Sequence, residues 1–362
     1  MTSLYPLRLP PSFRERIWGS HDLSPFFGKQ ERKIGEAWYS FDENVIANGP
    51  LQGRTLGELM ADCGRELLGE SALALAAKRR AVSNALRSGR SPVPPGPFTP
   101  SFPILAKLLF TSDRLSVQVH PKDDYAWANE NSPGKTEMWY VASAEPGARV
   151  ALGLNRTLSR DGLRKAAVSG EIESCLNWLE VRAGQSIFVP SGTLHTVGPG
   201  LVLCEIQQNS DVTYRLFDFG RLGAEGKPRE MHIEKAVEVA EPQPHSGSIE
   251  PFRFPRASWT RELLVACPCF AVEHWGWERK IEYQGHPDHA NLLIFLQGEG
   301  TVAGQPYAPG DAYLIPAGLQ SFDLSPESPA KAIRAFVPNL NVVRNELAAA
   351  GYGVQTWPRL LP

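Results

Sequence analysis

The chain has 362 residues, and 42% of them are hydrophobic, which suits two modest packed domains and argues against a disordered or fibrous protein. The formal net charge is −2 and no run of five or more like charges occurs, so nothing indicates a nucleic-acid or membrane-surface partner. The longest apolar run, residues 292 to 296, cannot span a bilayer, and the start MTSLYPLRLPPSFRER has prolines where a secretory signal needs apolar residues, so we expect a soluble cytoplasmic protein.

The first predicted element is helical. Residues 52 to 92 carry leucines interleaved with charged residues, which is the pattern of an amphipathic helix. The proline-rich run SPVPPGPFTP begins at the end of this stretch. We therefore expect a helical segment that ends in a loop.

From residue 102 onward the sequence changes to short β-rich runs. Gly and Pro separate them, and the runs are ILAKLLF, LSVQVH, KTEMWYVASA, ARVALGL, QSIFVP, LHTVG and GLVLCEIQQ. Many short strands at close spacing are typical of a sandwich or a barrel. One helix is expected among them, over residues 160 to 169, because Thr157 or Ser159 can cap its start and Gly170 can end it.

A domain boundary is expected at residues 241 to 257, where EPQPHSGSIEPFRFP is rich in proline and has no periodicity, as in a linker. Beyond it, HANLLIFLQGEGTVAG and APGDAYLIPAG predict a second, smaller β-domain. The predicted division is a catalytic domain over residues 1 to 240, the linker, and a C-terminal domain over residues 258 to 362.

Three segments of the first domain present polar side chains opposite apolar ones. In LSVQVH, strand periodicity puts Gln118 and His120 on one face and the valines on the other. In KTEMWY it puts Lys135 and Glu137 on a shared face. The run GQSIFVPSGTLH ends at His195, after a turn whose Pro and Gly fix the position of that histidine.

Two imidazoles and one carboxylate from separate strands suit a divalent metal, because nitrogen and oxygen donors leave a position open for water or substrate. Gln118 faces the same way as His120 and could add a fourth donor through its carbonyl oxygen. The alternative is that each histidine is a hydrogen-bonded structural residue, and spacing alone leaves both interpretations open.

The run that ends at His195 fits the second motif of the cupin superfamily, G-x5-P-x-G-x2-H, at every fixed position. The first cupin motif departs from the usual form. Gln118-x-His120 stands where HxH is usual, and Glu137 follows His120 by seventeen residues instead of by a few.

This altered motif, with QVHP, GKTEMWY, PSGTLH and EIQQNSDVTYRLFDFGR, resembles the type I mannose-6-phosphate isomerases, a family of zinc-dependent cupins. ERIWG, GEAW, NGPLQGRTLGEL and FPILAKLL agree, so the resemblance covers most of residues 12 to 240. It implies two cupin-like jelly-roll barrels and an enzyme that interconverts mannose 6-phosphate and fructose 6-phosphate. The chain departs from the family in the lengthened segment SALALAAKRRAVSNALRSGRSPVPPGP, and at Gln185 and Phe219, where Asp and Trp or Tyr are expected.

The resemblance also implies roles for single residues. One zinc ion per chain would be bound by Gln118, His120, Glu137 and His195. Arg215, in TYRLFDFGR, would be the catalytic arginine, and Lys135, in GKTEMWY, would bind substrate in the same pocket. The alternatives are an ion pair of Arg215 with Asp211 or Asp218, and a solvated hairpin position for Lys135.

An aldose–ketose isomerase moves a proton between C1 and C2 through a cis-enediol, so negative charge builds on oxygen in the transition state. Zinc, as a Lewis acid, and the Arg215 guanidinium could both stabilise that charge. Arginine cannot easily act as a base, and the base stays open among a water on the metal, Glu205 and groups near His195.

The second half repeats the cupin pattern in a degenerate form. PGDAYLIPAG matches the second motif, but Ser321 stands at the position of the motif histidine, so no metal is expected there. His286 and His289 are then expected to be surface or structural residues.

Two other functions are compatible with the predicted site. An Fe(II) dioxygenase could use the same ligands, and a non-catalytic cupin could bind a sugar phosphate without turning it over. The presence of every proposed ligand together with Arg215 favours the isomerase, because a buried charged site is costly to keep. The sequence does not reveal the epimer specificity or the oligomeric state.

Overall fold

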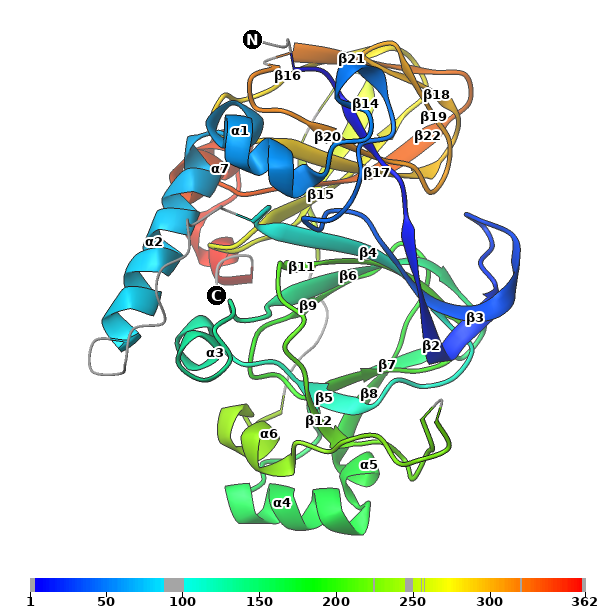
Figure 1. Ribbon diagram of the computed structural model, residues 1–362, viewed down its shortest axis with the longest axis vertical. Helices are drawn as coiled ribbons and strands as arrows, with labels where there is room; N and C mark the ends of the chain where they lie inside the picture. The colour runs from blue at the N-terminus through cyan, green and yellow to red at the C-terminus, as the bar shows by residue number, and fades with distance from the viewer. Residues whose placement is uncertain are drawn as a thin grey trace.

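The computed structural model describes residues 4–87, 101–223, 225–244, 250–254, 256, 258–319 and 321–359. Within these ranges the chain forms four β-sheets, which pair into two barrels. Figure 1 shows the first barrel in the lower half of the molecule and the second barrel above it.

The first barrel joins a six-stranded and a five-stranded sheet. The six-stranded sheet has the order β2 (Ser12–Asp22), β3 (Lys29–Trp38), β4 (Ile104–Thr111), β11 (Leu201–Gln208), β6 (Glu137–Ala144), β9 (Ser186–Val189). The five-stranded sheet has the order β12 (Tyr214–Phe217), β5 (Val117–Val119), β10 (His195–Val197), β7 (Arg149–Leu154), β8 (Leu176–Glu180). Leu109 and Val141 from one sheet pack with Val150 and Leu152 from the other inside the barrel.

The second barrel joins a seven-stranded and a four-stranded sheet. The seven-stranded sheet has the order β1 (Leu7–Leu9), β20 (Ala312–Ile315), β17 (Asn291–Gln297), β22 (Ala330–Phe336), β15 (Ala271–Trp277), β14 (Trp259–Ala266), β13 (Phe252–Phe254). The four-stranded sheet has the order β16 (Ile281–Gln284), β21 (Ser321–Pro326), β18 (Gly300–Val302), β19 (Gln305–Tyr307). Because β1 pairs with β20, a strand from the beginning of the chain completes the C-terminal sheet.

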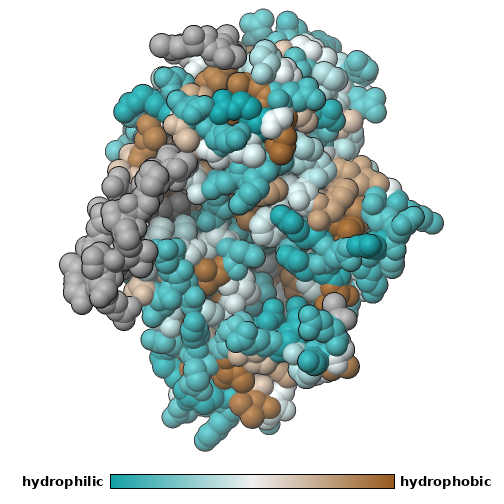
Figure 2. Space-filling model, in the orientation of Figure 1, coloured by the Kyte–Doolittle hydropathy of each residue, from teal (hydrophilic) through white to brown (hydrophobic). Residues whose placement is uncertain are grey.

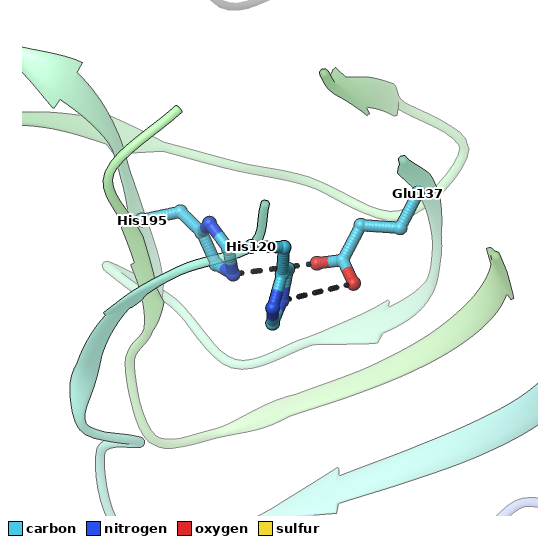
Figure 3. A group of neighbouring side chains, drawn as sticks. All are labelled: His120, Glu137 and His195. Carbon is cyan, nitrogen blue, oxygen red and sulfur yellow. Dashed lines mark ion pairs between the residues drawn. The ribbon is translucent and has the colours of Figure 1, made fainter. Parts of the chain in front are cut away.

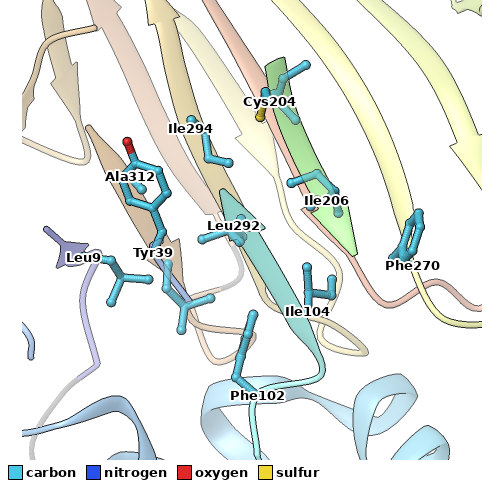
Figure 4. Packing of buried hydrophobic residues seen from close by; sticks show 14 of the residues in the cluster. Leu9, Tyr39, Phe102, Ile104, Cys204, Ile206, Phe270, Leu292, Ile294 and Ala312 are labelled. Carbon is cyan, nitrogen blue, oxygen red and sulfur yellow. The ribbon is translucent and has the colours of Figure 1, made fainter. Parts of the chain in front are cut away.

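The six-stranded and seven-stranded sheets pack against each other on a large apolar cluster (Figure 4). Ile104 and Ile206 contribute from one sheet, and Leu292 and Ile294 from the other. Both faces of β4 are covered, so all eight of its residues are buried, as expected for a strand with a nearly continuous apolar sequence. Side chains alternate along β4, and Lys107 therefore faces the interior of the first barrel.

The helical prediction for residues 52 to 92 is confirmed as two helices, α1 (Leu56–Leu68) and α2 (Glu70–Arg87), and residues 88–92 lie outside the described ranges. Gly69 separates the helices with φ of 78°, and a Cβ atom there would lie 2.4 Å from the backbone carbon of Asp288. The end of α1 binds the second barrel, since the Ala317 amide donates to the Leu67 carbonyl at 3.1 Å.

The helix predicted over residues 160 to 169 is confirmed as α4 (Arg160–Ser169). The Ser159 hydroxyl accepts the Gly162 amide at 3.0 Å, and Gly170 ends the helix in the left-handed conformation. Together with α5 (Ile172–Cys175) and α6 (Ile233–Val239), α4 covers the outer face of the five-stranded sheet. The short helix α3 (Asp123–Asn129) follows β5.

The remaining helices are η1 (Gly49–Leu51), α7 (Leu340–Ala349) and η2 (Val354–Arg359). Val343 of α7 packs on β13 and β14, and β13 lies within the segment predicted as a linker. Residues 245–249, 255 and 257 of that segment lie outside the described ranges, and the division into domains stays a prediction. None of the described helices combines the length and the apolar character needed to cross a membrane.

Candidate active site

Opposite walls of the first barrel bring the predicted ligands together. In the five-stranded sheet, Gln118 of β5 pairs with His195 of β10 on one side and with Arg215 of β12 on the other. His120 follows directly after β5. Glu137 begins β6 in the opposite sheet, and Figure 3 shows its carboxylate pointing toward both imidazoles.

His120, Glu137 and His195 form a tight, buried cluster in which each residue is 1% exposed. The two carboxylate oxygens of Glu137 face different histidines (Figure 3). His120 Nε2 lies 3.4 Å from Oε2, and His195 Nε2 lies 3.4 Å from Oε1. The three residues that the sequence analysis selected therefore converge on one point, with their ligand atoms within 4.8 Å of one another.

Hydrogen bonds fix the orientation of both imidazole rings. His120 Nδ1 lies 3.0 Å from the Val212 carbonyl oxygen, and His195 Nδ1 lies 2.9 Å from the Thr193 carbonyl oxygen. A carbonyl only accepts, so each Nδ1 carries the proton and each Nε2 presents its lone pair. Burial, with the nearby Lys135 ammonium, lowers the pKa of His120 to about 3, and burial also lowers the pKa of His195, so both rings are neutral.

The cluster fits a divalent metal. Within the described ranges, His120 Nε2 and both carboxylate oxygens of Glu137 are buried without a hydrogen-bond partner, which is costly unless something binds them. Two neutral nitrogens and a carboxylate are a zinc-type donor set. The Gln118 amide nitrogen lies 3.2 Å from His195 Nε2, and rotating the amide by half a turn would bring its oxygen to the same place.

A cavity of about 410 Å³ adjoins the cluster. Its charged lining residues are Arg16, Glu36, Lys107, Lys135, Glu205, Asp211, Arg215 and Arg229. Cations outnumber carboxylates among them, so the cavity favours an anionic ligand.

Lys135 is buried in this cavity instead of lying on a solvated hairpin. Its Nζ is 3.3 Å from Glu137 Oε2. Burial by itself lowers the pKa of Lys135, but the carboxylates of Glu137 and Glu205 outweigh burial and raise that pKa, so the side chain is a cation. It is therefore a donor to any oxygen that enters the cavity.

Arg215 lines the same cavity, and in the described part of the chain it forms no ion pair with Asp211 or Asp218. Its Nη1 donates to the Glu230 carbonyl at 2.7 Å, and its buried Nε has no hydrogen-bond partner there. Burial and the neighbouring Arg229 guanidinium lower the pKa of Arg215. The alternative of a structural ion pair is therefore wrong.

Glu205, one of the three candidates for the base, also faces the cavity. Lys107 Nζ lies 3.3 Å from Oε1, and the Trp139 indole donates to Oε2 at 3.1 Å. Burial and the charge of Glu137 raise the pKa of Glu205. Lys107 was not predicted, although a single lysine in the apolar run ILAKLLF indicates a buried cation with a partner.

Arg229, between β12 and α6, is a further cavity residue that the sequence did not reveal. Asp218 holds two guanidinium groups: Arg229 donates from Nε at 2.7 Å and Arg221 from Nη2 at 2.7 Å. Only Arg229 lines the cavity, while Arg221 also binds Asp113 at 3.0 Å. Nothing in the local sequence distinguishes the two arginines, because tertiary folding alone decides which one reaches the cavity.

No protein-family model matches the chain. It is 34% identical to mannose-6-phosphate isomerase ManA of Bacillus subtilis over 333 residues, which cover 88% of this chain and 95% of the relative. It is 33% identical to the mannose-6-phosphate isomerase of Streptococcus mutans over 327 residues, which cover 88% and 94%.

Solved structures agree with these relatives. The crystal structure of mannose 6-phosphate isomerase from Bacillus subtilis superposes with a TM-score of 0.77 at 30% identity, over 92% of this chain and 99% of that one. A zinc-bound mannose 6-phosphate isomerase, 16% identical, has the same fold with a TM-score of 0.67. The predicted mainly β fold of two cupin-like barrels is thus confirmed. The chain belongs to the mannose-6-phosphate isomerase family.

Proposed function

We propose that this enzyme interconverts mannose 6-phosphate and fructose 6-phosphate, with one zinc ion per chain bound by Gln118, His120, Glu137 and His195. The main support is the convergence of two imidazoles and one carboxylate on one point beside a cation-rich cavity, with His120 Nε2 and both Glu137 oxygens buried without a hydrogen bond in the described part of the chain. The names of the relatives in Bacillus subtilis and Streptococcus mutans support the substrate, and the zinc-bound structure of a family member supports the metal.

The residues of the cavity suit proton transfer between C1 and C2. Zinc, when bound, supplies a Lewis acid that polarises the substrate carbonyl. Arg215 is held by the Glu230 carbonyl and has a free Nε, so its guanidinium can stabilise the negative charge that builds on oxygen as the cis-enediol forms. Lys135 donates to a substrate oxygen and so orients the sugar.

Glu205 is the group that we assign as the base. Lys107 and Trp139 hold one carboxylate oxygen each, so the group is oriented before substrate arrives. Such preorganisation is what a proton transfer at a fixed carbon needs.

Arg229 is assigned to the phosphate group. Asp218 binds one edge of its guanidinium, which fixes the side chain in the wall of the cavity. An arginine held in this way binds phosphate oxygens with little loss of side-chain entropy. Together with Arg215 it gives the cavity two adjacent guanidinium groups for a dianion.

A coupled isomerase assay on several hexose phosphates, with chelated and zinc-reloaded protein, tests the proposal. We expect turnover of mannose 6-phosphate that chelation abolishes and zinc restores. Full activity without metal would exclude the metal mechanism, and turnover of a different sugar phosphate alone would exclude the substrate. The cytoplasmic location and the absence of nucleic-acid and membrane partners remain predictions.

A further inference from the structure

The large sheet of the second barrel repeats the strand order of the sheet in the first barrel. At matching positions, however, buried cations stand where the first barrel has carboxylates, and a carboxylate stands where it has a cation. The strand orders β3-β4-β11-β6-β9 and β14-β15-β22-β17-β20 correspond. Glu205 of β11 pairs with Lys107 of β4, and at the matching place Arg334 of β22 pairs with Glu273 of β15. A carboxylate and a cation have therefore exchanged positions between the two barrels.

A third position, on the neighbouring strand, also carries opposite charges in the two barrels. Glu36 of β3 pairs with the residue two places after Lys107, and Arg261 of β14 pairs with the residue two places after Glu273. The first barrel thus holds one cation and two carboxylates at these positions, and the second holds one carboxylate and two guanidinium groups. All six of these side chains are buried, so the charge reversal lies in the interior of the barrels and not on a surface.

The guanidinium of Arg334 reaches the place that corresponds to a metal ligand. Asn291 begins β17 as Glu137 begins β6, and Arg334 Nε donates to Asn291 Oδ1 at 2.7 Å. Arg334 Nη2 lies 2.8 Å from His289 Nε2, which accepts. Burial and the Arg334 charge lower the pKa of His289 to about 2, so this ring is neutral and adds no charge to the site.

A cavity of about 100 Å³ opens at this cluster. Arg261 and Arg334, which are 6% and 1% exposed, contribute guanidinium groups to its wall. Glu273 binds both of them, Arg261 at 2.6 Å and Arg334 at 2.9 Å, but it lies behind them and does not line the cavity. The wall therefore presents two cations against one carboxylate, that of Glu346.

Glu346 shows which chemistry suits the cavity. This residue of α7 lies at the rim, its side chain is 42% exposed, and its carboxylate is 2.9 Å from Arg261 Nη2. A carboxylate thus already binds the outer edge of a buried guanidinium. An incoming carboxylate or phosphate oxygen could take its place, since arginine binds both groups with the same donor geometry.

We propose that the second barrel binds a small oxyanion, a carboxylate or a phosphate group, in the cavity between Arg261 and Arg334, where it displaces the carboxylate of Glu346. At about 100 Å³, the cavity is much smaller than the catalytic cavity of about 410 Å³, so its ligand must be a small group. This site is separate from the catalytic cavity, and the proposal does not depend on the isomerase activity.

Titration calorimetry of the metal-loaded protein with inorganic phosphate, and separately with malonate, tests the site. Two binding phases are expected, one for the catalytic cavity and a second for the proposed site. Glu346→Gln removes the carboxylate that competes with the anion, so the Kd of the second phase should fall about tenfold relative to wild type, the value of one charge-assisted hydrogen bond. Glu262→Gln is the matched control, because Glu262 pairs with Arg253 and does not line the cavity. Phosphate binding in the catalytic cavity should be the same in all three proteins.

Crystals soaked in selenate locate the anion by anomalous scattering. A peak in hydrogen-bond contact with Arg261, together with the tighter phase of Glu346→Gln, supports the proposal, and the probe that gives this phase identifies the oxyanion. Peaks confined to the catalytic cavity overturn it. A peak at Arg261 also overturns the proposal if wild type, Glu346→Gln and Glu262→Gln give the same titration curves. That combination would mean an adventitious ion only.

Discussion

His195, a proposed metal ligand, shows how the fold orients a single side chain. The Thr193 carbonyl fixes the proton on Nδ1, and the strand register directs Nε2 toward Glu137. The same arrangement holds for His120 with the Val212 carbonyl. Ligands that are already oriented and neutral lose little entropy and need no deprotonation when a metal binds.

Replacing His195 with alanine should therefore remove metal and activity together. The remaining donors would be Glu137, His120 and the Gln118 amide, and a neutral amide oxygen is a much weaker zinc ligand than the imidazole that is lost. Metal analysis and the isomerase assay on the same preparation check this. His21→Ala, at an exposed position in β2, should keep both properties. A His195→Ala protein that retains stoichiometric metal would contradict the ligand assignment.

Arg215 should act on turnover more than on binding. Its free Nε and its place in the cavity suit charge that develops only in the transition state, so Arg215→Gln should lower kcat about 10²- to 10³-fold. Steady-state kinetics with a metal assay would show the loss of kcat at unchanged metal content. A kcat within a factor of ten of wild type would show that this arginine has no catalytic role.

Arg229 should act on binding more than on turnover. Arg229→Gln removes one charge-assisted contact to phosphate, so the KM for the sugar phosphate should rise about 10- to 100-fold with little change in kcat. Arg221→Gln is a matched control, because it also leaves Asp218 with one guanidinium but does not touch the cavity. Equal KM values for the two variants would refute the phosphate assignment.

At the scale of elements, short strands and caps decide where side chains end up. The three residues of β5 deliver Gln118 between His195 and Arg215, and a shift by one residue would turn all of these side chains to the other face. Helices α4 and α6 hold the outer face of this sheet through Leu163 and Ala236, which pack with its valines. The site is therefore supported from behind by helices that carry none of its ligands.

The cap of α4 offers a test at this scale. Ser159→Ala removes the side-chain acceptor of the Gly162 amide and should lower the free energy of unfolding by about 1 kcal/mol. Thr157 was the other candidate for the cap, but its hydroxyl binds Gln243. In denaturant unfolding, Thr157→Ala should therefore lose less free energy of unfolding than Ser159→Ala. A larger loss for Thr157→Ala would mean that the cap is misassigned.

At the scale of the whole molecule, the two barrels share one large apolar interface, and the second barrel includes a strand from the beginning of the chain. β1 joins the sheet of the second barrel, and the end of α1 binds the same barrel through Leu67. The lengthened segment SALALAAKRRAVSNALRSGRSPVPPGP thus begins just after the residues of α1 that contact the second barrel. The two halves should unfold together and not one after the other.

The buried ion pairs of the second barrel predict its response to acid. Burial alone raises the pKa of Glu273, but Arg261 and Arg334 outweigh it and bring the pKa down from 4.5 to about 2. The ionised carboxylate therefore stabilises the fold above pH 4.5, and this contribution is lost as the pH falls toward 2. The whole protein should thus lose stability in that window.

Urea unfolding of wild type and Glu273→Gln at several pH values checks this. Near neutral pH the variant leaves two buried guanidinium groups without their carboxylate and should lose on the order of 3 kcal/mol. The difference between the two proteins should narrow as the pH falls below 4.5. A difference that is constant with pH would show that Glu273 is not ionised in the fold.

Local patterns were enough to select the three residues that converge in the first barrel, and several elements. The alternation in LSVQVH and the turn before His195 depend on residues close in sequence, and so do the start and end of α4. The resemblance of QVHP and PSGTLH to a known family supplied the function that periodicity alone left open. These features are determined within a few residues, which is why the sequence by itself contained them.

Only tertiary structure decided the rest. The contact of Arg229 rather than Arg221 with the cavity, the pairing of Lys107 with Glu205, and the charge reversal in the second barrel each join residues far apart in the chain. No local pattern contains such information, because the free energy of a buried charge depends on which partner the other strands bring to it. The sequence therefore determined which residues could bind a metal, and the fold determined what surrounds them.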